Sequence, residues 1–130
     1  MNKRHHALLF CVAVAAIGFF PSGLFVLTAQ EDELDSLIVC RETQKLIFEN
    51  QFVRVIETVA PPGNREPKHR HGRGLSIALS DYDSETLTYP GPKLTRRHGT
   101  FGEVNWDEPT IHEVHNIGTT VKRNIRIEVK

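Results

Sequence analysis

From about residue 46 to the C-terminus, apolar residues alternate with polar ones or form short runs rich in Val, Ile, Phe and Thr. Alternation with a period of two is typical of β-strands, because successive side chains on a strand point to opposite faces. The plainest example is VKRNIRIEV at residues 121–129, in which every odd position is apolar except Arg123 and every even position is polar. We predict a strand over this segment.

Four further segments show related patterns: FVRVIETV, GLSIAL, ETLTYP and GEVNW. Turn-forming sequences separate them, namely PPGN, SDYDS, YPGPK, RHGT and NIGTT. No helical period of useful length follows residue 45, and DELDSLIVCRETQKL before the first strand indicates one short helix. About seven or eight short strands joined by tight turns predict an all-β domain, which is either a sandwich or a small barrel.

The N-terminus has the pattern of an export signal. A basic opening, MNKRHH, precedes an apolar run that starts at Ala7, and a second apolar patch ends at Ala29. We predict cleavage after Ala29 and a secreted or periplasmic protein. If the segment is retained instead, it is long enough to anchor the chain in a membrane. The expected organisation is residues 1–29 as signal peptide or membrane anchor, 30–45 as an extension with one short helix, and 46–130 as the β domain.

Length and charge exclude two classes of protein. A chain of 130 residues has room for one domain with a modest core and not for two catalytic domains. The full chain has 16 basic and 16 acidic residues, and because Lys3 and Arg4 precede the apolar run, the remainder is mildly acidic. Binding to nucleic acid requires an excess of clustered Lys and Arg, so we expect no nucleic-acid partner.

Cys40 is the one cysteine that remains once the signal is removed, so the mature chain cannot form an internal disulfide. Its neighbours in SLIVCRE include no group that would stabilise a thiolate. We expect Cys40 to be a small buried residue or a surface thiol rather than a nucleophile.

Histidines form the most specific pattern in the chain. In PPGNREPKHRHGRG, His69 and His71 are two positions apart, and this even spacing directs both side chains to the same face of an extended strand. A metal site needs at least one more ligand, and His112 in EPTIHEVHNIG is the candidate. Asn116 should share the face of His112, whereas His115 should point away unless a bulge intervenes.

These residues resemble the two conserved motifs of the cupin family. Gly63, five intervening residues, His69 and His71 match the opening of the first motif, and His112 followed by Asn116 matches the close of the second. The resemblance covers about residues 46 to 130. It implies a jelly-roll barrel, a divalent metal ion held by histidines in its mouth, a small-molecule ligand or substrate, and a homodimer.

The sequence departs from the family pattern in both motifs. Leu75 and Ser76 stand where cupins commonly carry a glutamate ligand, and the segment from Pro109 to His112 lacks the usual glycine. The expected site is therefore a set of three histidines: His69, His71 and His112. Such a set suits Fe, Zn, Mn, Ni or Cu, and ligand type alone does not select among them.

A three-histidine site resembles both zinc hydratase centres and the iron centre of thiol dioxygenases, which are themselves cupins. Without a carboxylate ligand the metal keeps its full double positive charge, which favours direct binding of an anionic substrate. The first hypothesis is an exported, metal-dependent cupin with dioxygenase-like oxidoreductase chemistry, ahead of isomerase or hydrolase activity. The alternatives are a non-enzymatic cupin that binds a small ligand or is stabilised by its metal, and an all-β interaction domain without metal.

The remaining histidines and the aromatic residues carry weaker predictions. We expect His98 in a turn, and we keep His115 as an alternative ligand or as a partner that orients one. Trp106, Phe101 and Tyr89 either line a pocket or pack in the core.

Overall fold

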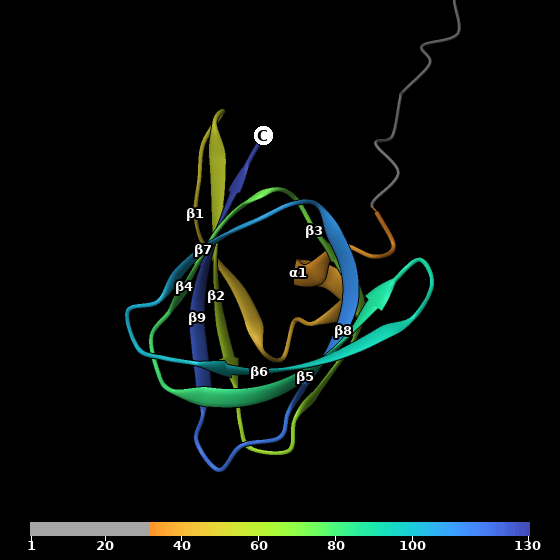
Figure 1. The fold of residues 1–130 in the computed structure, drawn as a ribbon. Coiled ribbons are helices and arrows are strands. Elements are labelled where there is room, and N and C mark those ends of the chain that lie inside the picture. Colours follow the sequence, from red (N-terminus) through yellow and green to blue (C-terminus); the bar gives the residue numbers. More distant parts are fainter. Residues whose placement is uncertain (1–31) are drawn as a thin grey trace, which may run out of the picture.

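The computed structural model describes residues 32–130, which form two antiparallel sheets and one short helix (Figure 1). The helix is α1 (Ser36–Val39), capped by the side chain of Asp35, which accepts a hydrogen bond from the backbone N–H of Leu37. The strands of the two sheets are β1 (Gln44–Glu49), β2 (Val53–Ala60), β3 (Arg65–His71), β4 (Gly74–Ala78), β5 (Tyr82–Tyr89), β6 (Lys93–Gly99), β7 (Val104–Asp107), β8 (Thr110–Asn116) and β9 (Lys122–Val129).

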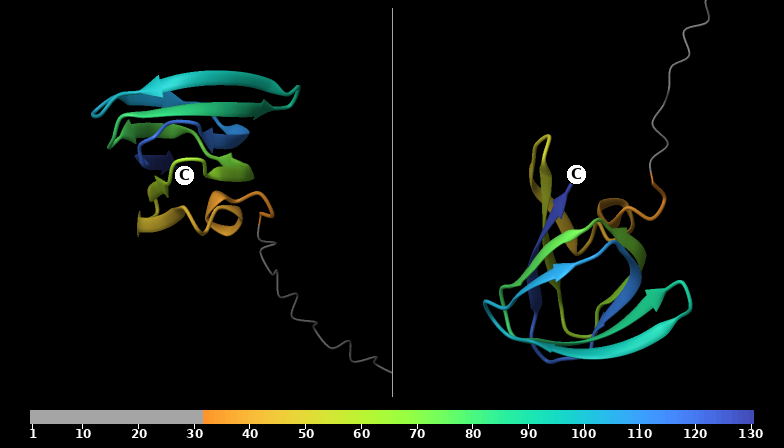
Figure 2. Two further views of the ribbon diagram at one scale, coloured as in Figure 1. Left: turned by 90° about the horizontal axis from the view of Figure 1, so that it is seen from below. Right: turned by 45° about the horizontal axis from the view of Figure 1, so that its top comes forward.

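The chain crosses repeatedly between the sheets, which gives the domain its jelly-roll form. One sheet has the order β1-β2-β9-β4-β7 and the other β3-β8-β5-β6, so strands distant in sequence become neighbours. The two sheets curve around a common interior (Figure 2). The described chain is thus nearly all β, as the alternating pattern predicts.

The predicted strands at FVRVIETV, GLSIAL, ETLTYP, GEVNW and VKRNIRIEV correspond to β2, β4, β5, β7 and β9. The predicted turn at RHGT is wrong, because β6 continues through His98 to Gly99 and the chain reverses after it. No helix within residues 32–130 is long and apolar enough to cross a membrane. The expected signal or anchor at residues 1–29 lies outside the described residues.

Polar side chains face the interior of the barrel. On β9 the alternation predicted from the sequence is present, but Lys122, Arg126 and Glu128 are the buried residues, whereas Arg123 and Val129 are exposed. Amphipathic strands usually turn their apolar face to the core. The reverse arrangement here, together with the polar residues of β3 and β5, creates an interior suited to binding polar groups rather than a closed hydrophobic core.

The opposite face of the five-stranded sheet carries an apolar row beside the ion pair of Glu57 with Arg123. Strand pairing places Phe48, Val55, Ile127, Leu75 and Trp106 in one row across β1, β2, β9, β4 and β7. The adjacent row includes Val104, which is 56% exposed. We call this surface the outer apolar face.

Gly74 allows β4 to approach β9 closely at the rim of the barrel. Its φ of 157° is rarely adopted by residues with a side chain, and a Cβ atom there would lie 1.9 Å from the carbonyl oxygen of Ile127. The pairing of β4 with β9 therefore requires glycine at this position.

Candidate metal centre

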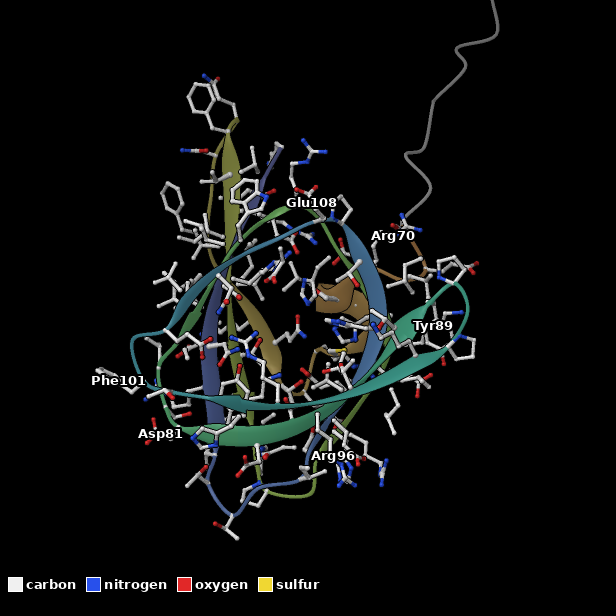
Figure 3. The ribbon with its side chains drawn as sticks, viewed as in Figure 1. Arg70, Asp81, Tyr89, Arg96, Phe101 and Glu108 are labelled. Carbon is white, nitrogen blue, oxygen red and sulfur yellow. The ribbon has the colours of Figure 1, made fainter. Side chains whose placement is uncertain are left out.

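Three histidine rings converge inside the barrel. His69 and His112 lie directly opposite each other in the pairing of β3 with β8, and His71 follows two positions along the same face of β3. One ring nitrogen from each histidine lies within 4.8 Å of the other two. Arg70, between the two β3 histidines, points out of the barrel and pairs with Asp32 (Figure 3). The predicted convergence of the three histidines is confirmed.

A backbone irregularity adds a carboxylate to this face. The register of β3 against β8 shifts between Glu66 and His69, so these residues, three positions apart, are both buried. In a regular strand an odd separation would direct them to opposite faces. The sequence analysis gave Glu66 no role because a bulge leaves no readable signal in the local pattern.

Hydrogen bonds hold the rings of His69 and His71 in the tautomer that has its proton on Nδ1 and none on Nε2. Nδ1 of His69 donates to the carbonyl oxygen of Pro67 at 2.7 Å, since a carbonyl can only accept. Nδ1 of His71 donates to Oε1 of Glu128 at 2.6 Å. Both contacts are of the kind that orients metal-binding imidazoles, and they leave the Nε2 lone pairs directed into the barrel.

The spacing of the nitrogens fits a shared ion. Nε2 of His69 and Nε2 of His112 are 3.0 Å apart. Two imidazole nitrogens bound to one ion at about 2.1 Å lie roughly 3 to 3.4 Å apart. In the metal-free protein, His112 can instead donate a hydrogen bond from Nε2 to His69, so the geometry accommodates both states.

Burial keeps the imidazoles of His69 and His112 neutral. Desolvation, followed by repulsion from His69 and His71, lowers the pKa of His112 to about 2. Desolvation also lowers the pKa of His69. Neutral imidazole is the form that binds metal ions, so the rings need not lose a proton at neutral pH to act as ligands.

Glu128 connects the cluster to α1 through a chain of ion pairs. Its second oxygen, Oε2, accepts from Nε of Arg54 at 2.6 Å, and NH1 of Arg54 donates to Asp35 at 2.5 Å. Burial alone would raise the pKa of Glu128, but the hydrogen bonds from His71 and Arg54 lower it. A buried, ionised carboxylate therefore accepts the hydrogen bond from Nδ1 of His71 and orients its ring.

The histidines border a cavity of about 430 Å³, which we call the barrel cavity. Glu66 also lines it and accepts hydrogen bonds from Thr43 at 2.8 Å and from Nε2 of Gln44 at 3.0 Å. Seven serine and threonine side chains contribute to the wall: Thr58, Ser76, Ser84, Thr86, Thr88, Thr95 and Thr110. A cavity of this size and polarity suits a small polar molecule.

The other candidate residues lie elsewhere. His98 is on strand β6, not in a turn, and its Nδ1 lies 2.9 Å from Asp83 at the surface. His115 lies on the face of β8 opposite His112, with Nδ1 3.8 Å from Glu85. Cys40 is buried, and desolvation raises the pKa of its thiol to about 12, which excludes an activated nucleophile. Asn116 donates to the carbonyl oxygens of Ala60 and Thr120 and so fixes the turn after β8.

Only one of the three aromatic candidates borders the cavity. Trp106 borders it, although its side chain belongs to the outer apolar face and is 55% exposed. Phe101 is exposed on the turn after β6. Tyr89 donates a hydrogen bond to Glu113 at 2.5 Å, and its ring makes a cation–π contact with the ammonium group of Lys68.

Comparison with known proteins assigns this fold. No family model and no curated protein matches the sequence. A cupin domain from Bordetella pertussis Tohama I superposes with a TM-score of 0.61 and 25% sequence identity, over 67% of this chain and 91% of that one. The described chain has the fold of a small cupin domain. A cupin superfamily protein from Desulfitobacterium hafniense DCB-2 shares the fold at a TM-score of 0.50 and 11% identity, over 66% of this chain and 74% of that one.

The chain has histidines that can hold a metal ion, and Leu75 and Ser76 stand where cupins commonly carry a glutamate ligand. Leu75, at one of the positions where that glutamate is expected, belongs to the outer apolar face, whereas Ser76 lines the barrel cavity. Glu66 is the carboxylate nearest to His69 along β3. Burial would raise its pKa, but Lys122, Gln44 and Thr43 lower it, so the group is an ionised acceptor already hydrogen-bonded to two side chains.

The carboxylate behind His71 generates a test. Replacing Glu128 by Gln keeps a hydrogen-bond acceptor but removes the charge that makes the imidazole a stronger ligand, so we expect metal affinity to fall about 10- to 100-fold. Affinity is measured by competition with a chromophoric chelator for Zn²⁺. The control is Arg54→Met, which removes the other partner of Glu128 and leaves its carboxylate on His71. An unchanged affinity in Glu128→Gln, or an equal loss in the control, contradicts the assignment.

Proposed function

We propose that this cupin domain holds a divalent metal ion through His69, His71 and His112 and uses it to transform a small molecule in the barrel cavity. The observation that carries the proposal is the convergence of three buried histidine rings on one polar cavity. Three protein ligands leave further coordination positions for water or substrate. When bound, the ion would supply Lewis-acid or redox chemistry.

Among reaction classes we favour oxygen-dependent oxidation. Three neutral donors without a carboxylate match the resemblance to the iron centre of thiol dioxygenases, and the ion's uncompensated charge favours an anionic substrate. The chain's own residues then have distinct roles. Pro67 and Glu128 hold two imidazoles in the metal-binding orientation, and the ionised Glu66 is placed to accept a hydrogen bond from a bound molecule.

A non-enzymatic metal-binding cupin is the second candidate. One observation favours it: Oε1 of Glu66 already accepts two hydrogen bonds, and its pKa is lowered. This makes Glu66 a weak general base at neutral pH. Turnover of a small carboxylic acid by the iron-loaded protein, followed as oxygen consumption, would distinguish the enzyme from the binder.

Export remains part of the proposal and rests on the sequence of residues 1–29. A cleaved signal gives a secreted or periplasmic protein, and a retained segment gives a membrane-anchored one. N-terminal sequencing of the protein isolated from its cells separates the two, because a cleaved chain would begin at Gln30.

Removal of single histidines tests the metal centre. We expect His69→Ala, His71→Ala and His112→Ala each to lose stoichiometric metal, measured by mass spectrometry of the purified protein. His115→Ala is the matched control, since it lies on the same strand as His112 but faces away from the cavity. The proposal is wrong if the three variants fold and keep one ion per chain, or if the control loses its ion to the same extent.

We further propose that the outer apolar face forms the contact of a homodimer. The face crosses all five strands, about 24 Å at the usual strand spacing of about 4.8 Å. A patch of that width is of the order of the roughly 800 Å² that each partner buries in a standard interface. A second copy fits because one self-complementary face suffices for a twofold dimer.

A double substitution tests the dimer. Val129 shares the outward face of Ile127 on β9, and Val104 and Val129 are 56% and 46% exposed. Replacing both by Lys should preserve the fold and convert the dimer to monomer, because the charges would be buried against each other. Mass is measured by light scattering during size-exclusion chromatography. Leu94→Lys, on the other sheet and 60% exposed, is the control and should remain dimeric. A monomeric starting protein, or a dimer unaffected by the double substitution, contradicts the proposal.

A further inference from the structure

Lys122 is the one basic side chain of the barrel cavity that has no partner within residues 32–130. Three basic residues line the cavity: Arg97, Lys122 and Arg126. Arg97 pairs with Glu103 at 2.8 Å, and Arg126 pairs with Asp107 and donates to the carbonyl oxygen of Gly72. The ammonium group of Lys122 makes no hydrogen bond or ion pair in this part of the chain, and its nitrogen lies 5.4 Å from the centroid of the Tyr82 ring.

The environment of Lys122 is buried but polar. The residue is 8% exposed and belongs to the inward face of β9. Desolvation lowers its pKa, while the charge of Glu66 opposes that effect. An ammonium group without a hydrogen-bonded counter-ion is costly in such a place, so an anion that enters the cavity gains a favourable ion pair there.

Neutral donors lie beside it. Thr58 on β2 is opposite Asn124 and therefore diagonal to Lys122 on the same inward face. Thr58 and Ser84 are both buried, and both line the cavity. An ammonium group with hydroxyl groups nearby matches the acceptor pattern of a carboxylate.

The charge of Lys122 also reaches the histidines, because it contributes to the lowered pKa of both His69 and His112. Lys122 and the metal centre therefore act on the same small cavity. The single ammonium group can pair with one carboxylate group of a ligand.

We propose that Lys122 is the recognition group for a carboxylate of the substrate, so the barrel cavity takes a small carboxylic acid whose other end reaches the histidine cluster. The second half of this statement rests on the proposed function. Binding of a carboxylate at Lys122 is independent of the proposed function, because it needs no metal. The two proposals can therefore fail separately.

The test compares succinate binding by wild-type protein and Lys122→Met, both metal-free, using titration calorimetry with sodium succinate at constant ionic strength. Methionine has a similar length and no charge, so we expect affinity for succinate to fall at least tenfold. The melting temperature of the ligand-free variant is measured as well, because the charge of Lys122 also stabilises the ionised Glu66. Arg97→Met is the matched control, because Arg97 lines the same cavity but is paired, and its affinity should change less than threefold.

Metal content separates this proposal from the metal centre. Lys122→Met should bind one Zn²⁺ per chain with wild-type stoichiometry. Unchanged succinate affinity in Lys122→Met, an equal loss in Arg97→Met, or no succinate binding by wild-type protein would overturn the role of Lys122. A lower melting temperature together with unchanged affinity would identify Lys122 as structural instead. Loss of metal by the histidine variants would be unaffected by any of these results.

Discussion

The pairing of β3 with β8 is the constraint on which the site depends. It places His69 opposite His112, and the alternation of the strand then brings His71 to the same face. The register shift before His69 turns Glu66 inward as well. A slip of one residue in this pairing would move the histidines of one strand to the outside, so the hydrogen bonds that set the register also set the candidate ligand geometry.

The polar interior has an energetic consequence. An unsatisfied buried polar group costs about 1–3 kcal/mol, so a barrel lined with such groups is stable only if most of them are paired. Glu128, Arg54 and Asp35 form one paired network, and Glu66 with Gln44 and Thr43 forms another. Oε1 of Gln44 and Oδ1 of Asn124 have no hydrogen-bond partner in the described residues.

Much of this arrangement could be predicted from the sequence. The alternation at residues 121–129 gave the strand, and the even spacing of His69 and His71 gave their common face. The sequence could not show which face of β9 points into the barrel. Apolar residues usually face inward, whereas the polar face of β9 does so here. Glu66 was missed because its orientation depends on a bulge, and Glu128 because its contact with His71 joins residues distant in the chain. The lack of a partner for Lys122 is likewise visible only in three dimensions.

The central claim is that three imidazoles bind one metal ion in this barrel. X-ray absorption spectroscopy of the protein loaded with one Zn²⁺ per chain tests it most directly, because imidazole rings give characteristic multiple-scattering features. The account predicts three imidazole nitrogens at about 2.0–2.1 Å, with the remaining coordination completed by oxygen. A spectrum with oxygen ligands alone, or with a single imidazole, would contradict it.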